Sequence, residues 1–180
     1  LLLKEIAGET GATMFVVVLW LFAILLSRLS GQDDIVIGVP VSGRPHSDLE
    51  CLIGVFINTI PIRLSIDDTQ SVLQFLAGVK QKCLRAFENQ DYPFEELVEK
   101  VAPERDINRN PLFDVLLNYM NHTETLASVW DHFSKEQYTY QGVSSKFDFS
   151  VDVHQYRDSM YLRFEYSTQL FKAETIDRFL

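Results

Sequence analysis

The hydrophobic pattern is dominated by one uninterrupted apolar run, residues 14–26, which ends at Ser27 and Arg28. The run is shorter than the roughly 18 apolar residues that a membrane-spanning helix needs. A helix that is apolar on all sides is buried inside a protein. Because Thr10 or Thr13 can cap its start, the pattern predicts a buried core helix that extends to about Leu29.

Two strands are predicted between this helix and residue 65. Residues 35–39 are short and continuously apolar, which is typical of a strand covered on both faces, and Pro40 is expected to end it. Residues 54–64 alternate as a strand does, with Val55, Ile57 and Thr59 on one face. Pro61 cannot donate a ladder hydrogen bond, so this strand is expected at an edge or a bulge.

Two amphipathic helices are predicted next. The first runs from about Ser71 to Phe87, with an apolar stripe that comprises Val72, Leu76, Val79, Cys83 and Phe87. The second begins near Pro93, where a missing N–H is tolerated, and stops before Pro103. Asp91, just before that start, is interpreted as its cap. The inward positions of the second helix are Phe94, Leu97, Val98 and Val101.

In the last third of the chain, apolar and polar residues again alternate as they do in strands. Residues 113–119 predict a strand, and residues 121–142 predict a long polar excursion. Residues 147–153 and 160–166 predict an antiparallel hairpin around Arg157 and Asp158, and a final helix starts near Lys172. The order of the elements predicts an α/β fold, a mixed sheet flanked by helices.

Composition and charge narrow the class of protein. The 180 residues, 47% hydrophobic and 23% charged, predict one domain or one lobe with a substantial core. The formal net charge of -9 argues against a nucleic-acid partner and against an anionic membrane surface. Cys51 and Cys83 lie among apolar neighbours, so we expect packed, reduced thiols and a cytoplasmic location.

The common catalytic signatures are absent from the sequence. It holds no GxSxG, GxGxxG or P-loop motif, and no Cys/His cluster with metal-ligand spacing. The four histidines are scattered, and no two are adjacent: His46, His122, His132 and His154. We therefore expect surface histidines and no catalytic base among them.

Three stretches resemble motifs of the condensation domains of nonribosomal peptide synthetases. Residues 53–63, IGVFINTIPIR, resemble the family's IGxFxNT…R, and residues 89–95, NQDYPFE, resemble (H/N)QDxPFE. Residues 105–112, RDINRNPL, resemble RDxSRNPL, with Asn108 in place of the usual Ser. The order and spacing of the three agree with the family, and stretches at 34–44, 146–150 and 165–171 are similar as well.

The resemblance implies a chloramphenicol-acetyltransferase-like fold of two lobes. The family's active-site motif, HHxxxDG, lies in the first lobe and is missing here, so residues 1–180 are expected to be the C-terminal lobe, cut at both ends. The parent domain would form amide bonds between aminoacyl or peptidyl thioesters on 4′-phosphopantetheine arms, with no cofactor bound directly. The implied partners are the N-terminal condensation lobe, peptidyl carrier proteins on the acceptor side and an adjacent adenylation domain.

The resemblance also assigns roles to residues, and it places no catalytic residue in this chain. Asn58, an amide in an apolar strand, either lines the substrate tunnel or bonds a neighbouring loop. The remaining motif residues are expected to be structural, with ion pairs between arginine and aspartate across a loop. They are Arg44, Arg63, Gln90, Asp91, Pro93, Arg105, Asp106, Arg109 and Asn110.

Three other functions stay open at this point. The chain can be a non-catalytic half-domain that binds a carrier protein or a first lobe. It can be a relative of the epimerization or cyclization type, or a stand-alone acyltransferase of related fold.

Overall fold

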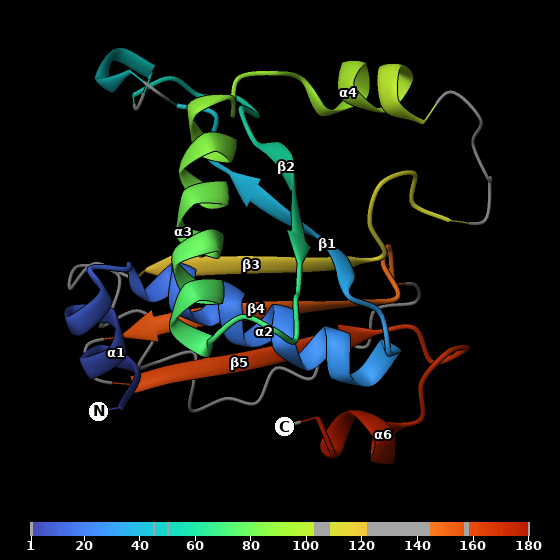
Figure 1. Cartoon of the computed structure of the whole chain (residues 1–180). Coiled ribbons are helices and arrows are strands. Elements are labelled where there is room, and N and C mark those ends of the chain that lie inside the picture. Colours follow the sequence, from blue (N-terminus) through green and yellow to red (C-terminus); the bar gives the residue numbers. More distant parts are fainter. Residues whose placement is uncertain are drawn as a thin grey trace. The chain divides into compact units, whose positions relative to one another are not determined.

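Two units make up the chain, residues 1–114 and residues 115–180 (Figure 1). The structure, a computed structural model, describes residues 2–44, 46–49, 51–102, 109–121, 145–156 and 159–179. Arg105 and Asp106, the predicted excursion at 122–142 and the turn at Arg157 and Asp158 lie outside these residues.

The apolar run forms the central helix of the first unit. Helix α1 (Leu2–Thr10) precedes α2 (Met14–Ser30), and the Thr13 side chain accepts a hydrogen bond from the Val16 N–H at 3.3 Å. Thr13 is therefore the cap, and Gly31 ends the helix with a φ of 68°. Seven residues of α2 are buried, as predicted for a core helix: Val16, Val17, Leu19, Trp20, Phe22, Ala23 and Leu26.

A two-stranded antiparallel ladder follows. Strand β1 (Asp34–Val41) pairs with β2 (Asn58–Ser65), in a register that sets Val41 opposite Asn58. Two predictions are wrong here. Pro40 does not end β1, because it stays in the ladder opposite Thr59, and the second strand begins at Asn58 and not at Gly54. Residues 54–57 are no strand because β1 ends at Val41 and offers them no partner.

Two helices complete the first unit. Helix α3 (Val72–Glu88) is capped by a reciprocal pair of hydrogen bonds between Ser71 and Gln74, and it packs against α2 and β2. Its buried residues are Phe75, Leu76, Val79 and Cys83. Helix α4 (Phe94–Val101) buries Val98. The predicted inward positions Val72 and Val101 are wrong, since these side chains at the helix ends are 61% and 63% exposed.

The second unit contains a small mixed sheet. Strand β3 (Val115–Asn121) pairs in parallel with β4 (Phe149–Tyr156), and β4 pairs antiparallel with β5 (Ser159–Tyr166). Helix α6 (Ala173–Asp177) follows. The rings of Phe149, Phe171 and Phe179 form a cluster with centroids 5.8–6.5 Å apart. The predicted hairpin and the predicted mixing of strand directions are confirmed.

The two cysteines differ in burial. Both cysteines are free, and Cys83 is buried whereas Cys51 is exposed, so the prediction of two packed thiols is wrong for Cys51.

No single helix in the described part of the chain has the length and hydropathy to cross a membrane. Only α1 and α2 together reach that length, and they are bent by 109° at their junction.

Candidate functional site around Asn58

The Asn58 side chain joins the start of β2 to the loop before α4. Its Nδ2 donates to the Gln90 carbonyl at 2.7 Å and to the Tyr92 carbonyl at 2.8 Å. Its Oδ1 accepts from the Phe94 N–H at 3.2 Å. Both donor hydrogens and the acceptor of the half-buried amide are therefore used on the backbone of residues 90–94.

Helix α4 receives its N-terminal cap from Asn58. Pro93 occupies the cap position and supplies no side-chain hydrogen bond, and the first helical N–H, that of Phe94, donates to Asn58. The interpretation of Asp91 as the cap is wrong, because its exposed carboxylate makes no such bond. A capping side chain placed 36 residues before the helix leaves no local signal, so sequence reasoning could not find it.

Arg44 organises the stretch between β1 and β2. Its guanidinium donates to the Leu49 carbonyl and to the Gly54 carbonyl, the latter at 3.4 Å, and it lies over the Phe56 ring at 4.3 Å. Gly43 has a φ of 60°, and a Cβ there would lie 1.7 Å from the Phe56 carbonyl oxygen. The stretch is thus packed closely against itself around the Arg44 guanidinium.

Arg63 forms an ion pair across the ladder. Its Nε and Nη2 donate to the Asp34 carboxylate at 2.6–3.1 Å. The hydrogen bond from Arg63 holds the pKa of Asp34 below its usual value of 3.8. Both side chains are largely exposed, so the pair aligns two strands and adds little stability.

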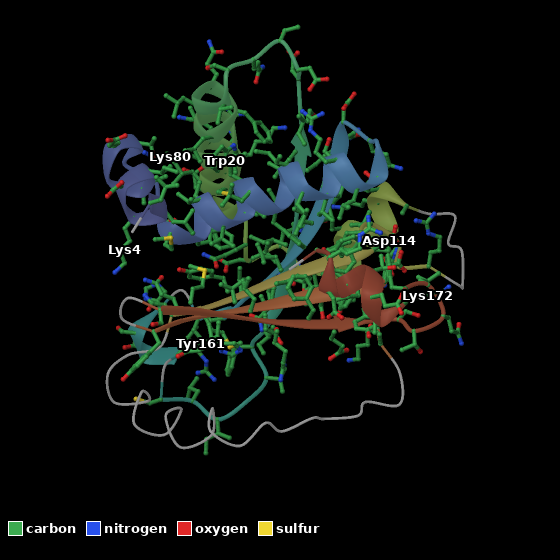
Figure 2. All side chains as sticks on the ribbon, turned by 90° about the horizontal axis from the view of Figure 1, so that it is seen from below. Lys4, Trp20, Lys80, Asp114, Tyr161 and Lys172 are labelled. Carbon is green, nitrogen blue, oxygen red and sulfur yellow. The ribbon has the colours of Figure 1, made fainter. Side chains whose placement is uncertain are left out.

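The residue that follows the third motif, Phe113, packs against β1. Arg109 forms an ion pair with Asp114, and the Arg109 side chain is 65% exposed. Phe113 is buried beside Phe94, with ring centroids 5.6 Å apart. The Phe113 ring also fills the space next to Gly38, where a Cβ would meet it at 2.2 Å. Figure 2 labels Asp114 at the end of this segment.

Two titratable side chains of the described chain have strongly raised pKa values, Cys83 in α3 and Tyr119 in β3. Burial raises the pKa of the Cys83 thiol and of the Tyr119 phenol to about 12, so both stay protonated near neutral pH. No three His, Cys, Asp or Glu side chains gather to hold a metal ion in the part of the chain that the structure describes. What the geometry defines is a scaffold in which Asn58, Arg44 and Arg63 bind neighbouring segments.

The sequence model of the Condensation domain matches residues 1–180. The chain therefore belongs to the condensation-domain family of nonribosomal peptide synthetases.

Relatives and solved structures agree with this assignment. The chain is 42% identical over 176 residues to gramicidin S synthase 2 of Brevibacillus brevis, covering 98% of this chain and 4% of the relative. A four-domain nonribosomal peptide synthetase bound to AMP and glycine matches with a TM-score of 0.85 and 26% identity, over 98% of this chain and 14% of that one. The X-domain from teicoplanin biosynthesis matches with a TM-score of 0.79 and 25% identity, over 98% of this chain and 41% of that one.

Proposed function

We propose that the chain is the C-terminal lobe of a condensation domain, and that the whole domain forms amide bonds between thioesters held by carrier proteins. The observation that carries the proposal is the extent of the match. The family model covers residues 1–180, whereas the chain spans 41% of the length of the teicoplanin X-domain. A second lobe of the same domain would supply the remainder, including the HHxxxDG motif that this sequence lacks.

In this proposal the chain contributes shape and no reacting group. The acyl and amine substrates would arrive on 4′-phosphopantetheine arms of peptidyl carrier proteins, and an adenylation domain would lie next in the parent. Fixing two tethered reactants in one tunnel can lower the barrier greatly, because it removes the entropy cost of bringing them together. A rigid tunnel wall would therefore raise the reaction rate even though it supplies no acid or base.

Asn58 would serve that wall by positioning. Since its amide is already bound to residues 90–94, it would fix the start of β2 and α4 and leave substrate contact to other groups. Arg44, Arg63 and Arg109 would hold their segments in the same way. We extend the structural role to the motif residues Gln90, Pro93, Arg105, Asp106 and Asn110.

A transfer assay with carrier-bound aminoacyl thioesters tests the proposal. The isolated 180-residue chain is expected to form no peptide. Peptide formation should return in a joined domain. In this protein the chain replaces the 176 matched residues of gramicidin S synthase 2, and the synthase supplies the HHxxxDG lobe. Turnover by the isolated chain, or an inactive joined domain that folds, would contradict the proposal.

A second candidate is a non-catalytic binding module. The observation that favours it is the exposure of several large apolar side chains before β2, with Ile53, Val55 and Ile57 between 69% and 104% exposed. A module of this kind would bind a carrier protein or a separate first lobe. If the chain is such a module, it should bind a purified carrier protein or first lobe in a pull-down. The joined domain would then still form no peptide.

A further inference from the structure

Strand β5 (Ser159–Tyr166) forms an open edge of the sheet in the second unit. It pairs with β4 on one side, and no further strand of the described chain lies beyond it (Figure 1). An open edge is a template for another strand, and natural sheets protect it with proline, lysine, a bulge or a very short strand. Strand β5 has none of these protections, because its eight residues, SMYLRFEY, pair with β4 without a break. The edge can therefore receive a partner strand.

Every second residue of β5 turns its backbone groups toward this edge. The Ser167 N–H donates to the Asp148 carbonyl at 2.9 Å, so these two residues form a hydrogen-bonded pair of the antiparallel ladder. Hydrogen-bonded and non-hydrogen-bonded pairs alternate along such a ladder. Since the register of β4 and β5 is unbroken, the N–H and C=O groups of alternate residues point away from β4. These residues are Met160, Leu162, Phe164 and Tyr166.

The side chains of β5 are exposed on both faces of the sheet. On the apolar face Leu162 is 51% exposed, although its partner across the ladder, Val153, is fully buried. On the other face lie the exposed side chains of Arg163 and Glu165. Arg163 donates to the Asp152 carboxylate of β4 at 2.8 Å, and its side chain is still 68% exposed. The edge therefore presents an apolar side chain and two opposite charges to an incoming strand.

The sequence of β5 is complementary to itself in one antiparallel register. Two copies related by a two-fold axis through Phe164 would set Arg163 of each copy opposite Glu165 of the other. Leu162 would lie opposite Tyr166, and the backbone groups at the edge would form about six hydrogen bonds. With the axis at Arg163 the two arginines would face each other, which is unfavourable. With the axis at Leu162 neither charge would face its opposite.

We infer that the open edge of β5 binds a second copy of this chain through the antiparallel pairing centred on Phe164. Charge complementarity selects this occupant, because each copy supplies the charge that the other one faces. The interface is isologous, since the same residues contribute from both copies, and the sheet continues from one copy into the other. The pairing uses no residue to which the proposed function assigns a role, so either can fail without the other.

Sedimentation of the 180-residue chain at rising concentration tests the pairing. The chain should pass from monomer to dimer. Glu165→Lys should lower the association constant by about tenfold or more, because two attractive pairs become repulsive. Since Glu165 is exposed, the substitution should move the midpoint of thermal unfolding by less than about 2 °C.

Glu99→Lys is the matched control. Glu99 is exposed on α4, and its substitution changes the net charge by the same amount, so the dimer should persist. A monomer at every concentration would overturn the inference. So would a dimer that Glu165→Lys weakens no more than Glu99→Lys does.

A mixture of two variants tests the register. One carries Glu165→Lys, and the other carries Arg163→Glu together with Asp152→Asn, which removes the carboxylate that would repel the new one. Neither variant should form a dimer alone, because like charges face each other in both. In the mixture every cation at these positions faces a carboxylate, so dimer should return. Two folded variants that stay monomeric when mixed would contradict the pairing centred on Phe164.

Amide exchange measured by NMR locates the contact in the chain without substitutions. The N–H groups of Leu162, Phe164 and Tyr166 point to the open edge and should exchange rapidly in the monomer. Their exchange should slow as the concentration rises, because the second copy accepts their hydrogen bonds. A dimer in which these three amides exchange as fast as in the monomer would overturn the inference.

Discussion

Replacing Asn58 by alanine should detach the N-terminus of α4. The substitution removes three hydrogen bonds, two to the carbonyls of residues 90 and 92 and one from the Phe94 N–H. One such bond contributes about 0.5–1.5 kcal/mol, and a helix cap alone about 1 kcal/mol. Because Asn58 is half-buried and water can reach part of the site, we expect a loss near the lower end, about 2 kcal/mol in total.

Hydrogen exchange followed by mass spectrometry measures this loss locally. A destabilisation of about 2 kcal/mol should accelerate amide exchange in α4 by about 30-fold, if these amides exchange through local opening. Exchange in α2 should stay slow, because its buried contacts do not involve Asn58. Asn89→Ala is the matched control, since Asn89 makes one exposed side-chain bond, to the Arg85 carbonyl at 2.8 Å. Its effect on α4 should be below about threefold.

A second substitution separates the capping bond to the Phe94 N–H from the two bonds that Asn58 donates to the carbonyls of residues 90 and 92. Asn58→Asp keeps an oxygen for the Phe94 N–H but sets a carboxylate against two carbonyl oxygens. It should therefore accelerate exchange in α4 at least as much as alanine does. If Asn58→Ala leaves exchange in α4 unchanged and abolishes peptide formation in the joined domain, the positioning role is refuted. The tunnel-wall interpretation of Asn58 then holds.

Three further outcomes are expected. Ellman's reagent should label one thiol in the folded chain and two in urea, because Cys51 is exposed and burial raises the pKa of Cys83 to about 12; rapid labelling of both would contradict this. Gly38→Ala should cost about 1–3 kcal/mol in urea unfolding, since its Cβ would lie 2.2 Å from an aromatic ring, and no change would show that the ring moves freely. The lowered pKa of Asp34 means that its pairing with Arg63 stabilises the fold above pH 3.8 and is lost as the pH falls below that value; Asp34→Asn should remove this part of the acid sensitivity.

Local patterns were sufficient for most of the fold. The apolar run at 14–26 predicted a core helix because a helix that is apolar on every face is buried, and seven residues of α2 between Val16 and Leu26 are buried. The alternation around Val151 and Val153 predicted the hairpin of β4 and β5 for a similar reason, since a half-buried strand repeats every two residues.

The errors arose where structure depends on a distant partner. Val55 and Ile57 carry a strand pattern, but a strand forms only where another backbone runs beside it, and β1 ends opposite Asn58. Asp91 had the right chemistry for a cap, yet the cap comes from Asn58, which lies far away in the sequence. Cys51 has apolar neighbours in sequence and is exposed in space, because its segment leaves the core after β1.

Peptide formation by the joined domain, compared with the isolated chain, tests the central claim most directly. Carrier-bound donor and acceptor thioesters are mixed with each protein, and the dipeptidyl product is measured by mass spectrometry of the acceptor carrier. The account predicts product from the joined domain, in which gramicidin S synthase 2 supplies the HHxxxDG lobe, and none from the 180-residue chain alone. Product from the isolated chain, or none from a folded joined domain, would contradict it.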